Sequence, residues 1–202
     1  MQRTLRVAPI VEGHGEVAAV RTLIQRIWTE VVQGDYVDVL SPIRQPKSKL
    51  IREQGLERAV RLATAKLTQQ QTERVQSLIL VLVDADEDCP AELGSRLIER
   101  ARSSTHVNAE VCIAQPEYET WFAGAATSLE EFLDLGNAPV PEDPEAQRAG
   151  KAWIKDRFRG AKYSETVDQV RLTARMDLLD CQRRCPSFSR MCAKLKAIAA
   201  SE

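Results

Sequence analysis

The sequence predicts an α/β protein built on a central, mainly parallel sheet of four strands that is flanked by helices. Two observations lead to this prediction. Short apolar runs that end in turn residues alternate along the chain with longer segments in which apolar residues recur at helical spacing. One of these runs, residues 77–83, is continuously aliphatic, which is typical of a strand that helices cover on both faces. An alternation of strands and helices favours a parallel sheet with right-handed crossovers.

The elements can be placed in order along the chain. Strands are expected at residues 5–11, 36–40, 77–83 and 108–114. Amphipathic helices are expected at residues 17–32, 50–71 and 93–101, with a basic loop after the second strand. From Tyr118 onward the pattern is helical. We therefore expect an α/β core over residues 1–124 and a helical C-terminal extension over residues 125–202 that packs on this core.

The charge balance excludes a protein that is basic over its whole surface. The 202 residues include 28 basic and 29 acidic side chains, so the net charge is −1. Binding to nucleic acid would need a local basic patch, because phosphates are neutralised by nearby lysine and arginine side chains. Two clusters are candidates either for such a patch or for ordinary solvated surface. They comprise Arg44, Lys47, Lys49 and Arg52, and Lys151, Lys155, Arg157, Arg159 and Lys162.

No segment of the sequence is a candidate for a membrane span. The longest apolar run, Leu78 to Val83, is far too short to cross a bilayer, and no apolar stretch follows Met1. We therefore expect a cytoplasmic protein that does not engage a membrane. The five cysteines are an odd number at scattered positions, which favours reduced thiols over a disulfide framework.

Acidic residues follow three of the predicted strands, and in a parallel sheet the carboxyl ends of all strands lie at one edge, where open α/β proteins place their sites. The acidic residues at this edge are Glu12, Asp84, Asp86, Glu117 and Glu119. Carboxylates brought together repel one another unless a cation or raised pKa values relieve them, so the pattern predicts a site for Mg²⁺ or Mn²⁺. Glu16, in the first turn of the next helix, would add a ligand for a second ion. Acidic residues in such turns also cap the N-termini of helices. For any one of these residues taken singly, capping is the alternative to metal binding.

The acidic motifs carry a resemblance to a known superfamily. Val11-Glu12-Gly13 after a first strand, and Asp84-Ala85-Asp86 after an aliphatic one, resemble the Toprim signature of topoisomerases, primases, ribosomal RNA maturases and OLD-type nucleases. Together with Pro116-Glu117-Tyr118-Glu119-Thr120-Trp121-Phe122, the pattern also resembles an uncharacterised family of small stand-alone Toprim-like bacterial proteins. Members of that family are often encoded beside ATPases, including in phage-defence loci. The resemblance implies a Toprim-like, Rossmann-type fold.

The resemblance also implies roles for individual residues. Glu12 would act in acid or base catalysis or bind metal, and Asp84 and Asp86 would bind magnesium. By similarity to OLD-type members, Glu119 would be a further acidic ligand and Lys162 a basic catalytic residue, a role that Lys151 could also fill. The expected function is a metal-dependent nuclease acting on DNA or RNA with a partner ATPase, and a homodimer is left open. The candidate nucleic-acid contacts are Arg44, Lys47, Lys49, Lys151, Lys155 and Arg159.

Three other functions fit parts of the sequence. The segment from Gly13 to Ala18 fits the G-x-G-x-x-A motif of dinucleotide-binding proteins, with Asp38 about twenty residues further on. The pair of aspartates at 84 and 86 matches the nucleophile motif of haloacid-dehalogenase phosphatases, but it follows the third strand instead of the first. The third alternative is a catalytically inactive Toprim-like subunit that serves as a scaffold for an ATPase.

Overall fold

The computed structural model describes residues 4–69, 75–136, 140–146, 150–160 and 162–201. In these ranges the chain forms one parallel sheet with the strand order β2-β1-β4-β5, and a short strand, β3, pairs with the end of β1. The strands are β1 (Thr4–Val11), β2 (Val37–Val39), β3 (Ile43–Arg44), β4 (Val75–Asp84) and β5 (Asn108–Ala114). The predicted parallel α/β sheet is confirmed. The fifth strand, β3, lies in the segment that the sequence indicated as a basic loop.

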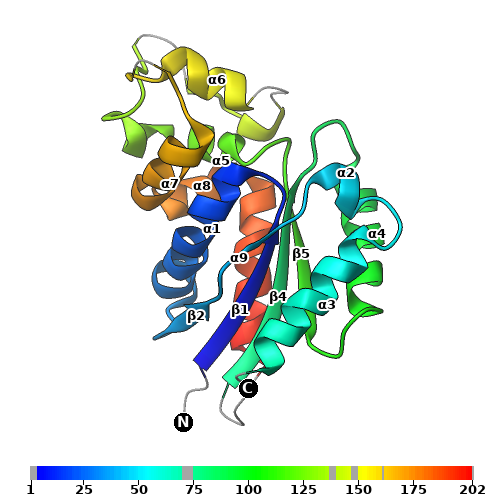
Figure 1. Ribbon diagram of the computed structural model, residues 1–202. Helices are drawn as coiled ribbons and strands as arrows, with labels where there is room; N and C mark the ends of the chain where they lie inside the picture. The colour runs from blue at the N-terminus through cyan, green and yellow to red at the C-terminus, as the bar shows by residue number, and fades with distance from the viewer. Residues whose placement is uncertain (1–3, 70–74, 137–139, 147–149, 161, 202) are drawn as a thin grey trace.

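Helices cover both faces of the sheet (Figure 1). Helices α1 (His14–Arg26) and α9 (Pro186–Ala199) pack on one face, and α3 (Gly55–Thr68) and α4 (Pro90–Arg102) pack on the other. Alternate residues of β4 enter the two cores, so that Leu78, Leu80 and Leu82 face α1 while Ile79, Val81 and Val83 face α3. This burial on both faces is why the strand is apolar at every position.

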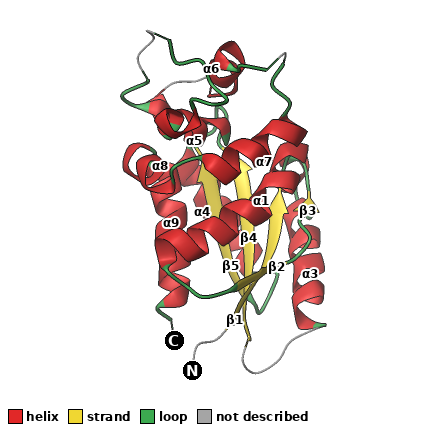
Figure 2. Cartoon of the chain, turned by 90° about the vertical axis from the view of Figure 1, so that its left-hand side faces the viewer, coloured by secondary structure: helices red, strands yellow, loops and turns green. Residues whose placement is uncertain are grey.

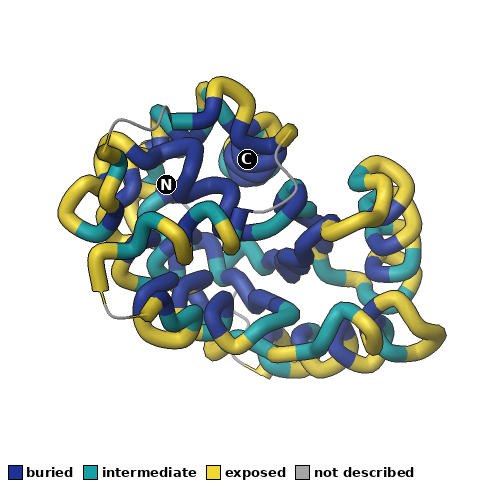
Figure 3. The backbone as a smooth tube through the Cα atoms, turned by 90° about the horizontal axis from the view of Figure 1, so that it is seen from above, coloured by how far each residue is buried: buried dark blue, intermediate teal, exposed yellow. Residues whose placement is uncertain are grey.

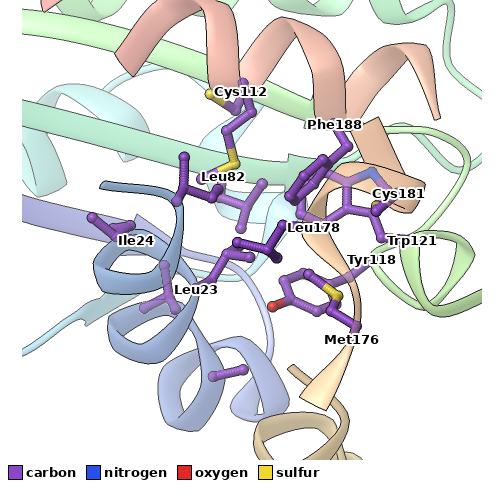
Figure 4. Packing of buried hydrophobic residues seen from close by; sticks show 14 of the residues in the cluster. Leu23, Ile24, Leu82, Cys112, Tyr118, Trp121, Met176, Leu178, Cys181 and Phe188 are labelled. Atoms are coloured by element: carbon purple, nitrogen blue, oxygen red, sulfur yellow. The ribbon is translucent and has the colours of Figure 1, made fainter. Parts of the chain in front are cut away.

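The C-terminal helices share a core with the sheet. Helices α5 (Glu119–Gly124), α6 (Gly150–Arg157), α7 (Glu165–Arg175) and α8 (Leu178–Arg184) gather beyond the carboxyl ends of the strands (Figures 1 and 2). Aromatic residues join them to α9, because the ring of Trp121 lies 4.9 Å from that of Tyr118 and 5.2 Å from that of Phe188 (Figure 4). All three side chains are fully buried. Residues 1–124 and 125–202 therefore contribute to one continuous apolar cluster.

Two predicted helices differ from those observed. The helix expected at residues 17–32 begins earlier, at His14, and ends at Arg26, after which the chain continues as the π-helical segment η1 (Ile27–Val32). The helix expected at 50–71 is divided into α2 (Lys47–Leu50) and α3, while residues 70 and 71 lie outside the described ranges. A turn separates the two helices, and within it Gln54 adopts the left-handed backbone conformation with a φ of 61°. The sequence pattern missed this break because it depends on a close contact between the turn and α2.

That contact involves Gly55, and it gives a testable prediction. A Cβ at this position would lie 1.8 Å from the carbonyl oxygen of Lys49, so Gly55→Ala must shift the backbone of α2. We expect a loss of about 1–3 kcal/mol in the free energy of unfolding, measured by urea titration. The matched control is Gly94→Ala within α4, where the new Cβ would meet only Ile113 at 3.6 Å. This control should be neutral or stabilising by up to about 1 kcal/mol, and equal losses in both variants would contradict the steric explanation.

Burial follows the layers of the fold. Seen from above, buried residues occupy the inside of the two helical layers and exposed residues their outer turns (Figure 3). All five cysteines are free thiols, and four of them are buried. Within the described ranges, no helix combines the length and the apolar character needed to span a bilayer.

Candidate active site

The sheet register brings the predicted acidic residues together. Val11 at the end of β1 is paired with Leu82 of β4, and Asp84 at the end of β4 is paired with Ala114 of β5. The turns that follow these strands therefore lie side by side at one edge of the sheet. The closest link is a hydrogen bond of 3.3 Å from the backbone N–H of Asp84 to a carboxylate oxygen of Glu12.

Asp84 lies at the centre of the acidic group. Its side chain is 8% exposed, and one carboxylate oxygen accepts a hydrogen bond of 2.9 Å from the backbone N–H of Tyr118. Burial raises the pKa of Asp84 well above its ordinary value, and the negative charges of Glu12, Glu16 and Glu119 raise it further. Four carboxylates from β4, α5, α1 and the turn after β1 thus act on one another electrostatically.

Two neighbours of Asp84 share this behaviour. Burial raises the pKa of Glu12 to about 7, and repulsion from Asp86 and Glu16 adds to the effect, which the Asp84 N–H and Lys47 oppose. The pKa of Glu119 is also raised to about 7, mainly by burial, while Lys151 opposes the rise. Two acidic side chains at this edge can therefore exchange protons near neutral pH.

Several polar atoms at the site are buried without a hydrogen-bond partner in the described part of the chain. They are Oε2 of Glu16, Oε2 of Glu119, and both amide atoms of Gln169, which α7 brings into the site. Glu119 and Gln169 are each 1% exposed. Buried polar atoms are normally satisfied, so unpartnered carboxylate oxygens next to a carboxylate cluster indicate room for water or for a cation.

Lys47 acts as an internal counterion on the outer side of the cluster. Its ammonium group lies 2.8 Å from Asp86 and 3.0 Å from Asp88, and it donates a hydrogen bond of 2.7 Å to the carbonyl oxygen of Ala85. Partial burial alone would lower the pKa of Lys47, but the two ion pairs outweigh it and raise the pKa. Asp86 can meet Lys47 because it adopts a φ of 49°, in the left-handed region that aspartate tolerates better than most residues.

The C-terminal helices form the other wall of the site. The hydroxyl of Tyr163 donates a hydrogen bond of 3.2 Å to Oε1 of Glu119, and the Lys151 ammonium pairs with Glu165 at 3.2 Å. Glu117 accepts a hydrogen bond of 2.7 Å from the backbone N–H of Lys151, which ties the first turn of α6 to the loop after β5. Burial lowers the pKa of Lys151, but Glu119 and Glu165 more than offset this and raise it.

The remaining predicted basic residues are distributed differently. The exposed ones are Arg44, Lys49, Arg52, Lys155, Arg159 and Lys162. The guanidinium of Arg159 donates to the carbonyl oxygens of Glu130 and Leu133, so this residue stabilises a loop of the C-terminal part. Lys151 is the predicted lysine that interacts electrostatically with Glu119, whereas Lys162 lies exposed on the loop after α6.

The glycine turn does not offer the space that a dinucleotide requires. Helix α7 packs against the start of α1, and a Cβ at Gly15 would lie 1.7 Å from the amide oxygen of Gln169 and 3.1 Å from the carbonyl oxygen of Glu165. A pyrophosphate needs this same space above the helix N-terminus. In addition, Asp38 forms an ion pair of 2.6 Å with Arg6. The geometry thus opposes the dinucleotide interpretation of the motif.

The carboxylate oxygens at this edge are suitable ligands for a hard cation, but they do not surround a cation on all sides. Carboxylate oxygens are the ligands that Mg²⁺ prefers, and unpartnered ones are present on Glu16 and Glu119. Among the residues that the structure describes, no three His, Cys, Asp or Glu side chains are placed to hold a metal ion together. Glu12, Asp84 and Asp86 thus do not form a ready three-ligand site as they stand. Mg²⁺ commonly binds through one or two carboxylates and completes its shell with water and substrate oxygens, and this set is compatible with that mode.

These features define the protein as a parallel α/β protein with a buried, mutually repelling carboxylate cluster at the carboxyl edge of its sheet. The model of a protein family described as Domain of unknown function (DUF4276) matches residues 11–196, and the chain belongs to this family. The match begins at the last residue of β1 and includes β2 to β5, the acidic edge and the helices α5 to α8 that wall it. Neither the curated proteins nor the solved structures gave a match to the chain.

Sequence reasoning missed three contributors to the site. Gln169 and the Tyr163 hydroxyl reach the cluster only because α6 and α7 dock above the sheet edge, and no local pattern encodes that docking. Lys47 was predicted as a nucleic-acid contact, and the structure pairs it with Asp86 and Asp88. The basic cluster from Arg44 to Arg52 pointed to Lys47 as a functional residue. Its pairing with acidic side chains cannot be inferred from composition.

Proposed function

We propose that the protein is a magnesium-dependent nuclease that hydrolyses phosphodiester bonds of DNA or RNA at this carboxylate cluster. The observation that carries the proposal is the burial of Asp84 among Glu12, Glu16 and Glu119, with raised pKa values and unpartnered carboxylate oxygens. Such an arrangement destabilises the protein unless a cation or a proton occupies it, so it is expected where a cation serves a function. The resemblance of the Glu12 and Asp84-Ala85-Asp86 motifs to the Toprim signature supports the same chemistry.

The side chains of the cluster suit distinct steps of hydrolysis. Asp84 and Asp86, with Glu16 and Glu119 on the inner side, would hold magnesium. When bound, the ion would polarise a phosphate and lower the pKa of a bound water. Glu12, whose pKa is raised to about 7, can accept the proton of an attacking water or return one to the leaving oxygen near neutral pH.

The two lysines next to the carboxylates would have different roles, one toward the phosphate and one toward the carboxylates. Lys151 lies in the electrostatic reach of Glu119 and is only half-buried, so its ammonium group is available to stabilise negative charge on a phosphate. Lys47 neutralises Asp86 and Asp88 and would be displaced or shared when a cation enters. We assign the catalytic lysine to Lys151 rather than to Lys162 on this electrostatic ground.

An inactive subunit that acts on an ATPase is the second candidate. It is favoured by the lack, among the described residues, of three carboxylates placed to hold an ion together. The ATPase partner and a cytoplasmic location are proposals that rest on the motif resemblance and on the sequence. Recovery of an ATPase with the native protein in a pull-down from its host would support the partner, and a pull-down without one would contradict it.

The nuclease proposal is tested by cleavage of labelled single-stranded and duplex DNA and of RNA. We expect cutting with Mg²⁺ or Mn²⁺ and none with a chelator, and a loss of roughly a hundredfold or more in Glu12→Gln, because general acid–base catalysis contributes that much. The control is Glu92→Gln, an exposed residue of α4, which should cut like the wild type. An absence of cutting on every substrate, also after addition of a co-purified ATPase, would favour the inactive subunit.

A further inference from the structure

A basic cavity adjoins the acidic cluster on the side of α2. It has a volume of about 550 Å³ and lies between α2 and the start of α3. Lys49, Arg52 and Arg58 bring three positive charges to its lining, against the single negative charge of Glu53, which leaves a net charge of +2. Gln45 and Gln54 add amide groups to the same lining. The cavity therefore has the composition of an anion site.

The cations of this cavity are free to meet a ligand. Lys49, Arg52 and Arg58 are exposed, and none of them forms an ion pair with another residue in the described ranges. This differs from Lys47 on the same short helix, which is committed to Asp86 and Asp88. Of the two lysines of α2, Lys47 therefore pairs with the acidic cluster and Lys49 lines the cavity.

The wall of the cavity is held in place by Arg100 of α4. Its guanidinium donates hydrogen bonds of 3.1, 3.2 and 2.7 Å to the carbonyl oxygens of Leu50, Ile51 and Arg52. It also binds both carboxylate oxygens of Glu57, at 2.7 and 3.0 Å. The pairing lowers the pKa of Glu57 and neutralises a charge that would otherwise repel an anion at the start of α3. Arg100 is therefore a positioning residue, and it fixes the turn that carries Arg52.

The cavity is joined to the acidic edge through the backbone. The N–H of Gln45 donates a hydrogen bond of 2.8 Å to the carbonyl oxygen of Val11, the residue before Glu12. Lys47, two residues further on, contacts the turn after β4. One short segment therefore serves both places, because Gln45 and Lys49 line the cavity while Lys47 between them contacts the acidic edge.

We infer that the cavity binds a backbone phosphate that flanks the scissile one, so that the substrate is a polynucleotide strand and not a small phosphodiester. This inference rests on the proposed function, since it takes the acidic cluster as the place of cleavage. Recognition of a phosphate by several guanidinium and ammonium groups is independent of base sequence. Arg52 and Arg58 supply the guanidinium groups, and Lys49 supplies the ammonium group.

The test compares the wild type with a double variant, Arg52→Ala with Arg58→Ala, and with the control Arg96→Ala on the exposed face of α4. Binding of a fluorescent oligonucleotide is measured in chelator at several salt concentrations, so that cleavage plays no part. We expect the double variant to bind roughly tenfold or more weakly and its salt slope to fall by about one to two, because fewer phosphates are neutralised. All three proteins should melt at the same temperature. They should also hydrolyse the artificial diester bis-p-nitrophenyl phosphate at the same low rate, because it has no flanking phosphate to occupy the cavity.

The outcomes separate this inference from the proposed function. Equal oligonucleotide affinity of the wild type and the double variant overturns the inference, whether or not the protein cuts. A wild type that binds no oligonucleotide overturns it as well. Weaker binding by the double variant, with no cleavage by any form, supports the phosphate site but overturns the nuclease proposal, and with it the placement of this phosphate next to a scissile one. Weaker binding together with unchanged hydrolysis of the small diester supports both.

Discussion

Replacing Asp84 by asparagine is expected to reduce magnesium-dependent cleavage by roughly a thousandfold or more, because a bound cation contributes several kcal/mol to such a reaction. The same substitution should stabilise the protein in chelator at neutral pH. The amide oxygen can still accept the hydrogen bond from the Tyr118 N–H, while the charge that Glu12, Glu16 and Glu119 oppose is removed. Thermal melting should show a rise in Tm of at least about 2 °C.

A matched control separates this effect from a general loss of charge. Asp35, which is exposed before β2, should tolerate Asp35→Asn with no change in Tm or in cleavage. Addition of Mg²⁺ or Mn²⁺ should raise the Tm of the wild type and of this control, but not that of Asp84→Asn, since ligands stabilise the state that binds them. An Asp84→Asn variant that is less stable in chelator and still gains from magnesium would contradict the assigned role of Asp84.

The second large effect concerns pH. Glu12 and Glu119 have pKa values of about 7 in the folded protein, against an ordinary value of 4.5. Between these values the folded state binds more protons than the unfolded state, so the free energy of unfolding must decrease as pH rises through this window. Asp84 and Glu145, whose pKa values are also raised, act in the same direction. The protein in chelator should therefore be more stable near pH 5 than near pH 8.

The expected size of the change can be bounded for Glu119. A shift from 4.5 to about 7 in a side chain that is only 1% exposed corresponds to a loss on the order of 3 kcal/mol once the carboxylate is fully ionised. Glu12 is more exposed, and solvent screening makes its contribution smaller. Urea unfolding at several pH values measures the sum. Magnesium should restore much of the lost stability near pH 8, and Glu119→Gln should flatten the profile; a wild-type profile that is flat or rising from pH 5 to pH 8 would contradict this account.

The sequence was informative where local patterns determine structure. β5 has the predicted bounds, and β4 is recognisable because burial on both faces makes it apolar throughout. Given a parallel sheet, the placement of Glu12 and Asp84 at one edge follows from the strand directions, whereas the hydrogen bond between them depends on β1 and β4 being neighbours, which the sequence did not indicate. The acidic edge could therefore be predicted without coordinates.

Features that depend on tertiary contacts could not be predicted in this way. The break before Gly55 arises from its contact with the Lys49 carbonyl, while the apolar spacing of residues 50–71 continues through it. Burial of Glu119, which raises its pKa, depends on the helices that dock around it, and the partner of its carboxylate, Tyr163, lies 44 residues away. Exposure and pairing of individual lysines likewise follow from the arrangement of whole helices.

The central claim is that the carboxylates at the sheet edge bind a divalent cation, and calorimetric titration of the metal-free protein with Mg²⁺ near pH 7 tests it most directly. We predict saturable binding that releases protons, seen as a heat that varies with the ionisation enthalpy of the buffer, because Glu12 and Glu119 are partly protonated at that pH. Asp84→Asn should abolish the binding. A wild type that shows no saturable binding at millimolar magnesium would contradict the claim. The repulsion among the carboxylates would then be relieved by protonation alone.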